Sequence, residues 1–239
     1  MVKIEMDRVD LKHVDLSFIP SLECNLRCSF CMYDCSPDNR AMLSYKEVEQ
    51  FARTVPWGKV KNVGFYGGEP AIDMWAYNMY IDLCPPKIPR FVITNGAWSQ
   101  EYRSVVDFCV WCASKRLAIQ VSSTGEHQAF QNRRFLEALA AKGFLQLKGP
   151  DEIHPMGRAS MKHWDCSDKC RWHPQPIRLG IFPPDYILMQ NCDGIYPVVG
   201  TCQFTFDEVF ENARRIRAGD LNCRTFRDLN DILKETSGD

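Results

Sequence analysis

The chain has 239 residues, of which 29 are basic, 30 are acidic and 12 are cysteines. This length suits one α/β domain, or one domain with a small appendage. A hydrophobic fraction of 45% and a charged fraction of 25% are typical of globular proteins and exclude disordered and fibrous ones. The net charge of −1 provides no general attraction to nucleic acids or anionic membranes.

The first residues, MVKIEMDRVDLKH, lack the apolar stretch of a signal peptide, and no apolar run is long enough to span a bilayer. We therefore expect a soluble, cytoplasmic protein with no membrane partner. In a reducing compartment, clustered cysteines are more often metal ligands or catalytic groups than disulfides.

Strand-like and helical segments alternate through the first 150 residues. Apolar or β-rich segments predict strands near residues 17–21, 59–66, 90–94, 117–122 and 144–148. Helices are predicted over residues 45–53, 72–83, 100–114 and 126–141, the first opened by a Ser44/Glu47 capping box and the third capped by Ser99. This alternation is typical of right-handed βαβ units, so it predicts a parallel sheet or barrel.

The pattern changes after Gly149, where prolines become frequent and periodicity is weak. Further on, residues 186–190 and 195–199 flank Asn-Cys-Asp-Gly, which predicts a β-hairpin. Two helices are predicted to close the chain, over residues 207–218 and after Thr225. We expect a barrel-like body over residues 1–150 and a smaller hairpin-plus-helix extension over residues 151–239.

Cys24, Cys28 and Cys31 form a C-x3-C-x2-C run directly after the first predicted strand. Three thiolates this close can bind three irons of a [4Fe–4S] cluster and leave the fourth iron open for chemistry. A zinc knuckle and three buried structural thiols are the alternatives, although structural zinc usually takes four protein ligands.

With Phe30 before the third cysteine, the run resembles the C-x3-C-x-aromatic-C signature of radical S-adenosylmethionine (radical SAM) enzymes. The resemblance covers residues 16–150 and implies an incomplete (β/α) barrel of roughly six strands. It implies that Cys24, Cys28 and Cys31 bind the cluster, that its open iron chelates SAM, and that Phe30 packs beside the adenine. Reductive cleavage of SAM would then give a 5′-deoxyadenosyl radical that abstracts hydrogen from the substrate, with an external electron donor such as flavodoxin or ferredoxin.

Gly67, Gly68, Glu69 and Pro70 resemble the GGEP motif of the same family. Glycines there let the backbone approach a ligand closely, and the resemblance implies that Glu69 accepts a hydrogen bond from the SAM ammonium. The alternative is a tight strand-to-helix turn with Glu69 exposed.

Polar residues follow the third and fourth predicted strands, where barrel sites assemble. Asn95, Ser122 and one of Arg133 and Arg134 resemble family positions that contact the ribose and carboxylate of SAM. Helix capping for the neighbouring hydroxyls and a solvated helix surface for the arginines are the alternatives.

A second cysteine group, made of Cys166, Cys170, Cys192 and Cys202, resembles the SPASM/twitch extension of some radical SAM enzymes. That resemblance implies an auxiliary [4Fe–4S] cluster, although Val198 stands where a cysteine is usual. Zinc or plain thiols are the alternatives. Three other cysteines (Cys84, Cys109 and Cys112) and three residues of the second predicted helix (Met74, Trp75 and Met79) are expected in the core.

Two classes of function follow from these motifs. The first is a radical SAM enzyme of oxidoreductase, isomerase or lyase type, acting on a small molecule, a nucleotide base or a peptide. With no leader-peptide-binding domain expected before the barrel, a small molecule or a nucleotide base ranks slightly ahead of a ribosomal peptide. The second is a non-catalytic zinc or iron–sulfur module that binds RNA or protein, which would call for a basic face and no SAM site.

Overall fold

One eight-stranded sheet organises the part of the chain that the computed structural model describes, residues 13–149, 177–190 and 197–218. Its strands are β1 (Val14–Phe18), β2 (Val60–Phe65), β3 (Arg90–Thr94), β4 (Leu117–Ser122), β5 (Leu145–Lys148), β6 (Ile177–Phe182), β7 (Tyr186–Met189) and β8 (Val198–Thr201). They lie in the order β5-β4-β3-β2-β1-β6-β7-β8. Strands β1 to β6 pair in parallel, and β7 and β8 continue the sheet antiparallel.

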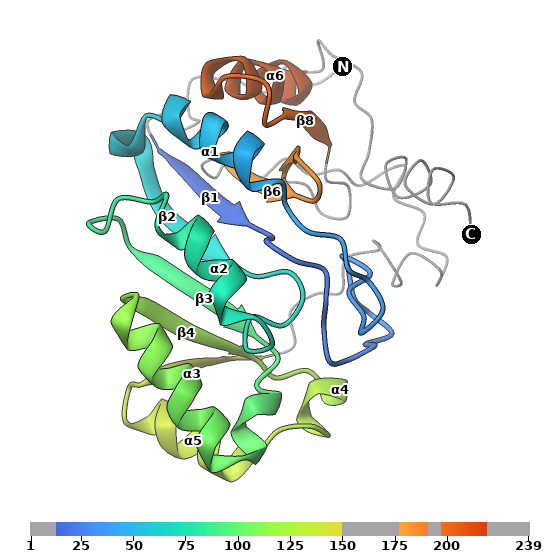
Figure 1. Cartoon of the computed structure of the whole chain (residues 1–239), viewed down its shortest axis with the longest axis vertical. Helices are drawn as coiled ribbons and strands as arrows, with labels where there is room; N and C mark the ends of the chain where they lie inside the picture. Colours follow the sequence, from blue (N-terminus) through green and yellow to red (C-terminus); the bar gives the residue numbers. More distant parts are fainter. Residues whose placement is uncertain (1–12, 150–176, 191–196, 219–239) are drawn as a thin grey trace.

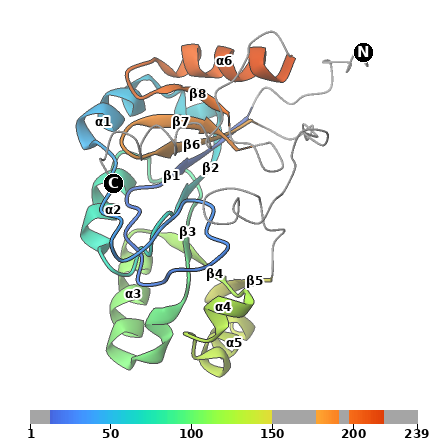
Figure 2. The same ribbon diagram turned by 90° about the vertical axis from the view of Figure 1, so that its right-hand side faces the viewer.

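Helices connect or follow these strands. They are α1 (Tyr45–Thr54), α2 (Met74–Ile81), α3 (Tyr102–Ser114), α4 (Gly125–Gln128), α5 (Arg133–Ala141) and α6 (Phe206–Ala218), with short 3-10 turns η2 (Trp57–Lys59) and η3 (Ala97–Gln100). In both views α1, α2 and α3 lie on the same side of the strands (Figure 1, Figure 2). We call the opposite side of the sheet the inner face. Among the described residues, no helix has the length and apolarity needed to cross a membrane.

The first strand begins earlier than predicted. The prediction placed it near residues 17–21, whereas β1 spans Val14–Phe18. Val14, Leu16 and Phe18 alternate into the core, which is the two-residue period of a strand buried on one face. Pro20 has no backbone N–H for a ladder bond, so the pairing ends before it. The predicted third and fourth strands have the bounds of β3 and β4, so those two predictions are confirmed.

Strand β6 was not predicted, because it lies in the proline-rich stretch after Gly149. It pairs in parallel with β1, with Val14 opposite Ile177 and Phe18 opposite Ile181. The predicted hairpin is present as β7 and β8, which pair antiparallel. Its turn at residues 191–194 and the predicted helix after Thr225 lie outside the described residues. The division of the chain at residue 150 stays a prediction, with β6 to β8 joining the same sheet as β1 to β5.

The predicted helix over residues 126–141 is two helices, α4 and α5. The break occurs because the side chain of Asn132 accepts a hydrogen bond from the Phe135 N–H (3.3 Å) and so starts a new helix. Ser99 does not cap α3, since it lies within η3 and its hydroxyl accepts from the Asn132 N–H (2.8 Å). Helix α1 begins at Tyr45 as predicted, but the Ser44 hydroxyl donates to the Glu47 carboxylate and caps no backbone group.

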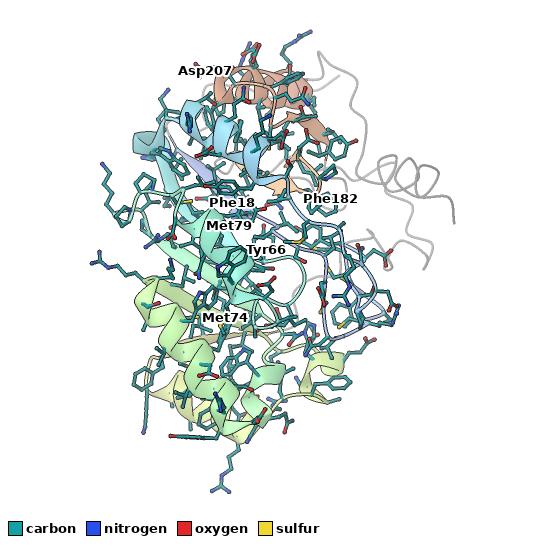
Figure 3. All side chains as sticks on the ribbon, in the orientation of Figure 1. Phe18, Tyr66, Met74, Met79, Phe182 and Asp207 are labelled. Carbon is teal, nitrogen blue, oxygen red and sulfur yellow. The ribbon has the colours of Figure 1, made fainter. Side chains whose placement is uncertain are left out.

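The main core lies between the sheet and the helices. Met74 and Met79 of α2 pack against it (Figure 3), whereas Trp75 is 71% exposed, so the prediction that Trp75 is a core residue was wrong. One position along a helix turns a side chain by about 100°, which carries Trp75 off the buried stripe. Cys84 and Cys112 are buried and Cys109 packs against the core, which confirms their predicted place.

Candidate active site

The predicted cysteine run lies in a long connection at the carboxyl ends of the parallel strands. We call residues 19–44, between β1 and α1, the cysteine loop. Figure 1 shows this loop, in deep blue, folded over the end of the sheet toward which the strand arrows point. Cys24, Cys28 and Cys31 all line one cavity of about 610 Å³. That volume is within the usual range for small-molecule sites, about 300–1,000 Å³.

The cavity extends from the cysteine loop along the inner face. Its lining residues from outside the loop are Tyr66, Gly67, Gly68 and Glu69 after β2, Ile93, Thr94 and Asn95 at β3, Ser122, Thr124 and His127 at β4 and α4, Lys148 and Gly149 at β5, and Arg178 on β6. Strand ends from several positions along the sheet therefore contribute to one site, which is the arrangement expected of a barrel site.

Backbone and side-chain N–H groups point at two of the cysteine sulfurs. The Leu26 N–H (3.4 Å) and the Asn95 Nδ2 (3.7 Å) donate to Cys24 Sγ, and the Cys35 N–H (3.3 Å) donates to Cys31 Sγ. Burial raises the pKa of the Cys24 thiol to about 11 against the effect of the Leu26 N–H, so without metal this thiol is protonated. Metal binding would release that proton.

The three cysteines supply the type of donor that an iron–sulfur cluster takes. In the described parts of the chain, no group of three His, Cys, Asp or Glu side chains is arranged to hold a metal ion. Each cysteine of a cube-type cluster binds a different iron, so the thiols need only surround the cube. N–H groups aimed at sulfur also favour thiolate ligands. The donor set and its surroundings therefore fit a [4Fe–4S] cluster.

The two glycines of the GGEP segment admit the cysteine loop. A Cβ on Gly68 would lie 1.8 Å from the Glu23 carbonyl oxygen, and a Cβ on Gly67 would lie 2.7 Å from that of Ser21. The Gly68 N–H donates to the Ser21 carbonyl (2.7 Å) and the Glu69 N–H to the Glu23 carbonyl (2.9 Å). The close approach predicted here is thus between two segments of the protein itself, and it holds Cys24 at the cavity wall.

Glu69 is 3% exposed, so it is not the exposed turn residue of the alternative interpretation. Its carboxylate accepts hydrogen bonds from the Thr94 hydroxyl (2.6 Å), the Asn95 N–H (2.8 Å) and the Ala71 N–H (3.1 Å). Burial raises its pKa to about 6, and these three bonds oppose the rise. A carboxylate has about four acceptor positions, so these bonds leave one for a ligand.

A buried glutamine that the sequence analysis did not single out joins the ends of β3 and β4. Gln131 Nε2 donates to the carbonyls of Asn95 and Ser122, both at 2.6 Å. Asn95 in turn donates from Nδ2 to Asn25 Oδ1 (2.8 Å). The predicted site residues Asn95 and Ser122 are therefore fixed beside the cysteine loop. Nothing in the sequence around Gln131 distinguishes it from a solvated helix residue.

Helix α4 contacts the cysteine loop on the other side of the cavity. Glu126 accepts from the N–H of Ser29 (2.8 Å) and contacts its hydroxyl as well. Phe30 meets the ring of His127 edge-on, with the ring centroids 5.2 Å apart. Burial lowers the pKa of His127, so its ring is neutral near pH 7. Phe30 and His127 both line the cavity and form an aromatic wall there.

A hydrogen-bond network centred on Gln190 lies on the inner face. Its Oε1 accepts from the hydroxyls of Ser17 (2.8 Å) and Tyr66 (2.9 Å), and its Nε2 donates to the Tyr33 hydroxyl (3.0 Å). Gly180 has no side chain, which lets the Gln190 amide lie where a Cβ would be, 2.3 Å from its Nε2. Tyr33 belongs to the cysteine loop, so this network ties the loop to β1, β2 and the end of β7.

Some predicted site residues do not meet at the cavity. Arg133 and Arg134 occupy exposed positions on α5, where Arg133 pairs with Glu137 (3.2 Å). Cys202 is 1% exposed and packs in the main core, and burial raises the pKa of its thiol. Pro70 is buried and does not line the cavity. The other predicted auxiliary ligands, Cys166, Cys170 and Cys192, lie outside the described residues.

Comparison with known proteins finds similarity to solved structures, not to known sequences. No protein-family model matches the chain, and no curated protein matches it by sequence. BtrN, solved in complex with AdoMet and 2-DOIA, is 12% identical, with 87% of each chain covered and a TM-score of 0.59. Histidine-tagged anSMEcpe with bound AdoMet is 14% identical, with 88% of this chain and 84% of that chain covered and a TM-score of 0.50.

Streptococcus suis SuiB bound to S-adenosylmethionine is 14% identical over 74% of this chain, with a TM-score of 0.35, and the match spans 60% of the length of SuiB. The likeness to BtrN and anSMEcpe shows the fold. It is an α/β fold, an incomplete (β/α) barrel with an open and mostly parallel sheet. The predicted fold class is therefore confirmed.

Proposed function

We propose that this protein is a radical SAM enzyme. The observation that carries the proposal is that Cys24, Cys28 and Cys31 line the same cavity as Glu69 and Asn95, at the carboxyl ends of a partial barrel. The fold shared with BtrN and anSMEcpe, each solved with AdoMet bound, supports it. A non-catalytic module would not need a cavity of about 610 Å³ beside its metal ligands.

Each group of residues has a task in this proposal. Cys24, Cys28 and Cys31 bind a [4Fe–4S] cluster, which with SAM supplies the radical chemistry of hydrogen abstraction. Phe30, Glu69, Asn95 and Ser122 hold SAM, and the cysteine loop and α4 exclude water from the cavity. Arg133 and Arg134 are left out, because they do not line the cavity.

The test is the triple change of Cys24, Cys28 and Cys31 to Ala. After anaerobic reconstitution the variant should hold about four fewer irons and form no 5′-deoxyadenosine from SAM under dithionite. Cys109→Ala, which alters a thiol on α3 that does not line the cavity, is the control and should keep both properties. Production of 5′-deoxyadenosine by the triple variant would refute the proposal.

We further propose an auxiliary [4Fe–4S] cluster on Cys166, Cys170 and Cys192, with Cys202 as the predicted fourth ligand. Cys202 is the least suited of the four to bind the cluster, because its side chain would have to leave the apolar core to reach it. Iron and zinc analysis decides among the metals. About eight irons per chain support the cluster, about four with stoichiometric zinc indicate a structural zinc, and about four without zinc indicate plain thiols.

Partners and location follow from the proposed chemistry. An external reductant such as flavodoxin or ferredoxin supplies the electron, and the oxygen-sensitive cluster suits a cytoplasmic protein. The substrate is a small molecule, a nucleotide base or a peptide that enters the cavity together with SAM.

A further inference from the structure

A second, smaller cavity lies at the amino end of β3, the strand that Arg90 begins. Its volume is about 290 Å³, and none of its described lining residues lines the cavity of the three cysteines. Thr94, which does line that larger cavity, lies four residues further along β3, or about 13 Å of strand. The second cavity is therefore separate from the candidate active site. The charged residues among its described lining are Arg90, Lys115, Arg116 and Asp82.

Arg90 is a buried cation without an opposite charge beside it. It is 9% exposed, and its Nε is buried without a hydrogen-bond partner. Among the described residues, its side chain makes one hydrogen bond, from Nη1 to the Ile81 carbonyl at 3.4 Å, and no ion pair. The thiol of Cys84, which also lines the cavity, supplies no charge, because burial raises its pKa to about 12. A buried guanidinium gains much more from an anion than from one long bond to a carbonyl.

The register of the sheet places Arg116 beside Arg90. Arg90 of β3 and Leu117 of β4 are partners across the two strands, which lie about 4.8 Å apart. Arg116 directly precedes Leu117, in the turn between α3 and β4. It is exposed, and in the described part of the chain neither a hydrogen bond nor an ion pair holds its side chain. Its guanidinium is therefore available to the cavity that it lines.

The third cation and the carboxylate neutralise each other. Lys115 Nζ binds both carboxylate oxygens of Asp82, at 2.8 and 2.9 Å. Asp82 follows Ile81, whose carbonyl accepts from Arg90, so Lys115 and Arg90 both reach the end of α2. The carboxyl ends of α2 and α3 each carry about −0.5 of a charge. Together with one carboxylate they offset about two of the three positive charges, so the cavity keeps a positive charge of about one.

We infer that the second cavity binds a small oxyanion, a phosphate or a carboxylate, through Arg90 and Arg116. A guanidinium presents a planar fork of N–H donors that matches either group in a bidentate way. Both arginines line the same small cavity from neighbouring strands, so one anion can accept from each. The volume lies at the low end for small-molecule sites and suits a single phosphate or a short carboxylate, not a nucleotide. This inference does not depend on the proposed function.

The experiment is isothermal titration calorimetry of the full chain with its cluster reconstituted, at pH 7 and constant ionic strength. The probes are inorganic phosphate, acetate and the neutral acetamide. We expect saturable binding of an anion and none of acetamide, and the anion that binds more tightly identifies the group. Arg90→Met and Arg116→Met should each weaken that binding about tenfold or more, which is the loss of one charge-assisted hydrogen bond. Asp82→Asn should strengthen it, because the change removes the one carboxylate of the described lining. Lys142→Met, which alters the exposed lysine that caps α5, is the control and should bind as the wild type does.

The inference is overturned if neither anion binds saturably to the wild type. It is also overturned if the two arginine variants bind the anion as tightly as the control, which would place the anion outside the second cavity. If Arg90→Met does not fold, Arg116→Met and Asp82→Asn decide, because both of these residues are exposed. Unchanged affinity in those two variants would then refute the assignment.

Discussion

Glu69 shows how one buried side chain can serve both the fold and the site. Its carboxylate fixes the end of β3 through Thr94 and Asn95, and Asn95 in turn faces Cys24. Replacing it with alanine would leave three donors without their acceptor, at about 1–3 kcal/mol for each one that stays buried and unsatisfied. Loss of SAM binding in Glu69→Ala could therefore come from a disturbed turn. Glu69→Gln is the more informative change, since it keeps the size of the side chain.

Glu69 should make the stability of the metal-free protein depend on pH. Its pKa is about 6 in the folded protein and 4.5 ordinarily, so between these values the folded state binds more protons than the unfolded state. The contribution is present in full below about pH 4.5 and is lost as the pH rises through 6, a change of about 2 kcal/mol. Urea unfolding of wild type and Glu69→Gln from pH 4 to 7.5 should show their difference in unfolding free energy falling by that amount. A constant difference would contradict the prediction.

Asn95 should tune the cluster through its bond to Cys24. Hydrogen bonds to the ligating sulfurs raise the reduction potential of an iron–sulfur cluster by stabilising the added negative charge. Asn95→Leu removes the Nδ2 donor 3.7 Å from Cys24 Sγ, so the midpoint potential should become more negative. Redox titration followed by EPR measures it. Asn212→Leu, which removes a bond to Val199 on β8, should leave the potential unchanged.

Site residues could be predicted from the sequence where a short motif with a fixed spacing contains them. The cysteines and the GGEP segment lie in short motifs, and the structure places them at one cavity. Gln131 and Gln190 could not be found in this way, since their partners lie up to 173 residues away and depend on the register of the strands. The polar side chains that organise the inner face acquire their roles only when the sheet has formed.

At the level of elements, the cysteine loop is held from several sides. The GGEP segment binds its backbone at Ser21 and Glu23, Glu126 of α4 binds Ser29, and Gln190 binds Tyr33. The three contacts come from the segment after β2, from α4 and from the residue after β7. These contacts hold the loop through residues other than the three cysteines, which reduces the ordering cost of assembling three ligands.

Gly68→Ala should displace the cysteine loop. The added Cβ would lie 1.8 Å from the Glu23 carbonyl oxygen, a backbone atom that can move only with the loop. We expect a loss of stability of about 1–3 kcal/mol and reduced iron incorporation on reconstitution. Gly58→Ala is the matched control, because nothing lies within 4 Å of a Cβ there. Normal iron content and stability in Gly68→Ala would show that the loop tolerates the shift.

Helix and strand types were predictable for most elements, and their ends less so. The helix predicted over residues 126–141 is broken where Asn132 caps α5 through the Phe135 N–H, and the Asn132 N–H binds the Ser99 hydroxyl. The second of these contacts joins residues distant in sequence and leaves no local pattern. The predicted start of β1 was too late, because the alternation of buried residues begins at Val14, before the apolar residues on which the prediction was based.

At the scale of the whole molecule, the last strands of the chain add to the sheet beside its first strand. Strand β6 pairs with β1 in parallel, although more than 150 residues separate them, and β7 and β8 extend the sheet beyond it. Parallel pairing across such a distance cannot be recognised from local periodicity. Arg178 reaches the cavity only through this pairing, so the cavity depends on the later part of the chain as well as on the first 150 residues.

A chain truncated after Gly149 should therefore fail to form the native fold. The truncation removes all pairing partners of β1 on one side, and with them the five side chains that β6 and β7 contribute to the main core, namely Ile177, Leu179, Ile181, Ile187 and Met189, each at most 1% exposed. Burial of each large apolar side chain stabilises a fold by about 1.5–3 kcal/mol, so their joint loss is comparable to the whole stability of a typical domain, about 5–15 kcal/mol. Near-UV circular dichroism and size-exclusion chromatography should show loss of fixed tertiary packing or aggregation.

Ile181→Asp in the full chain tests the same contact without truncation, because it places a charge at a 0% exposed position between β1 and β7. A cooperative unfolding transition in the truncated chain, with a cluster on Cys24, Cys28 and Cys31, would instead establish the first 149 residues as an independent folding unit.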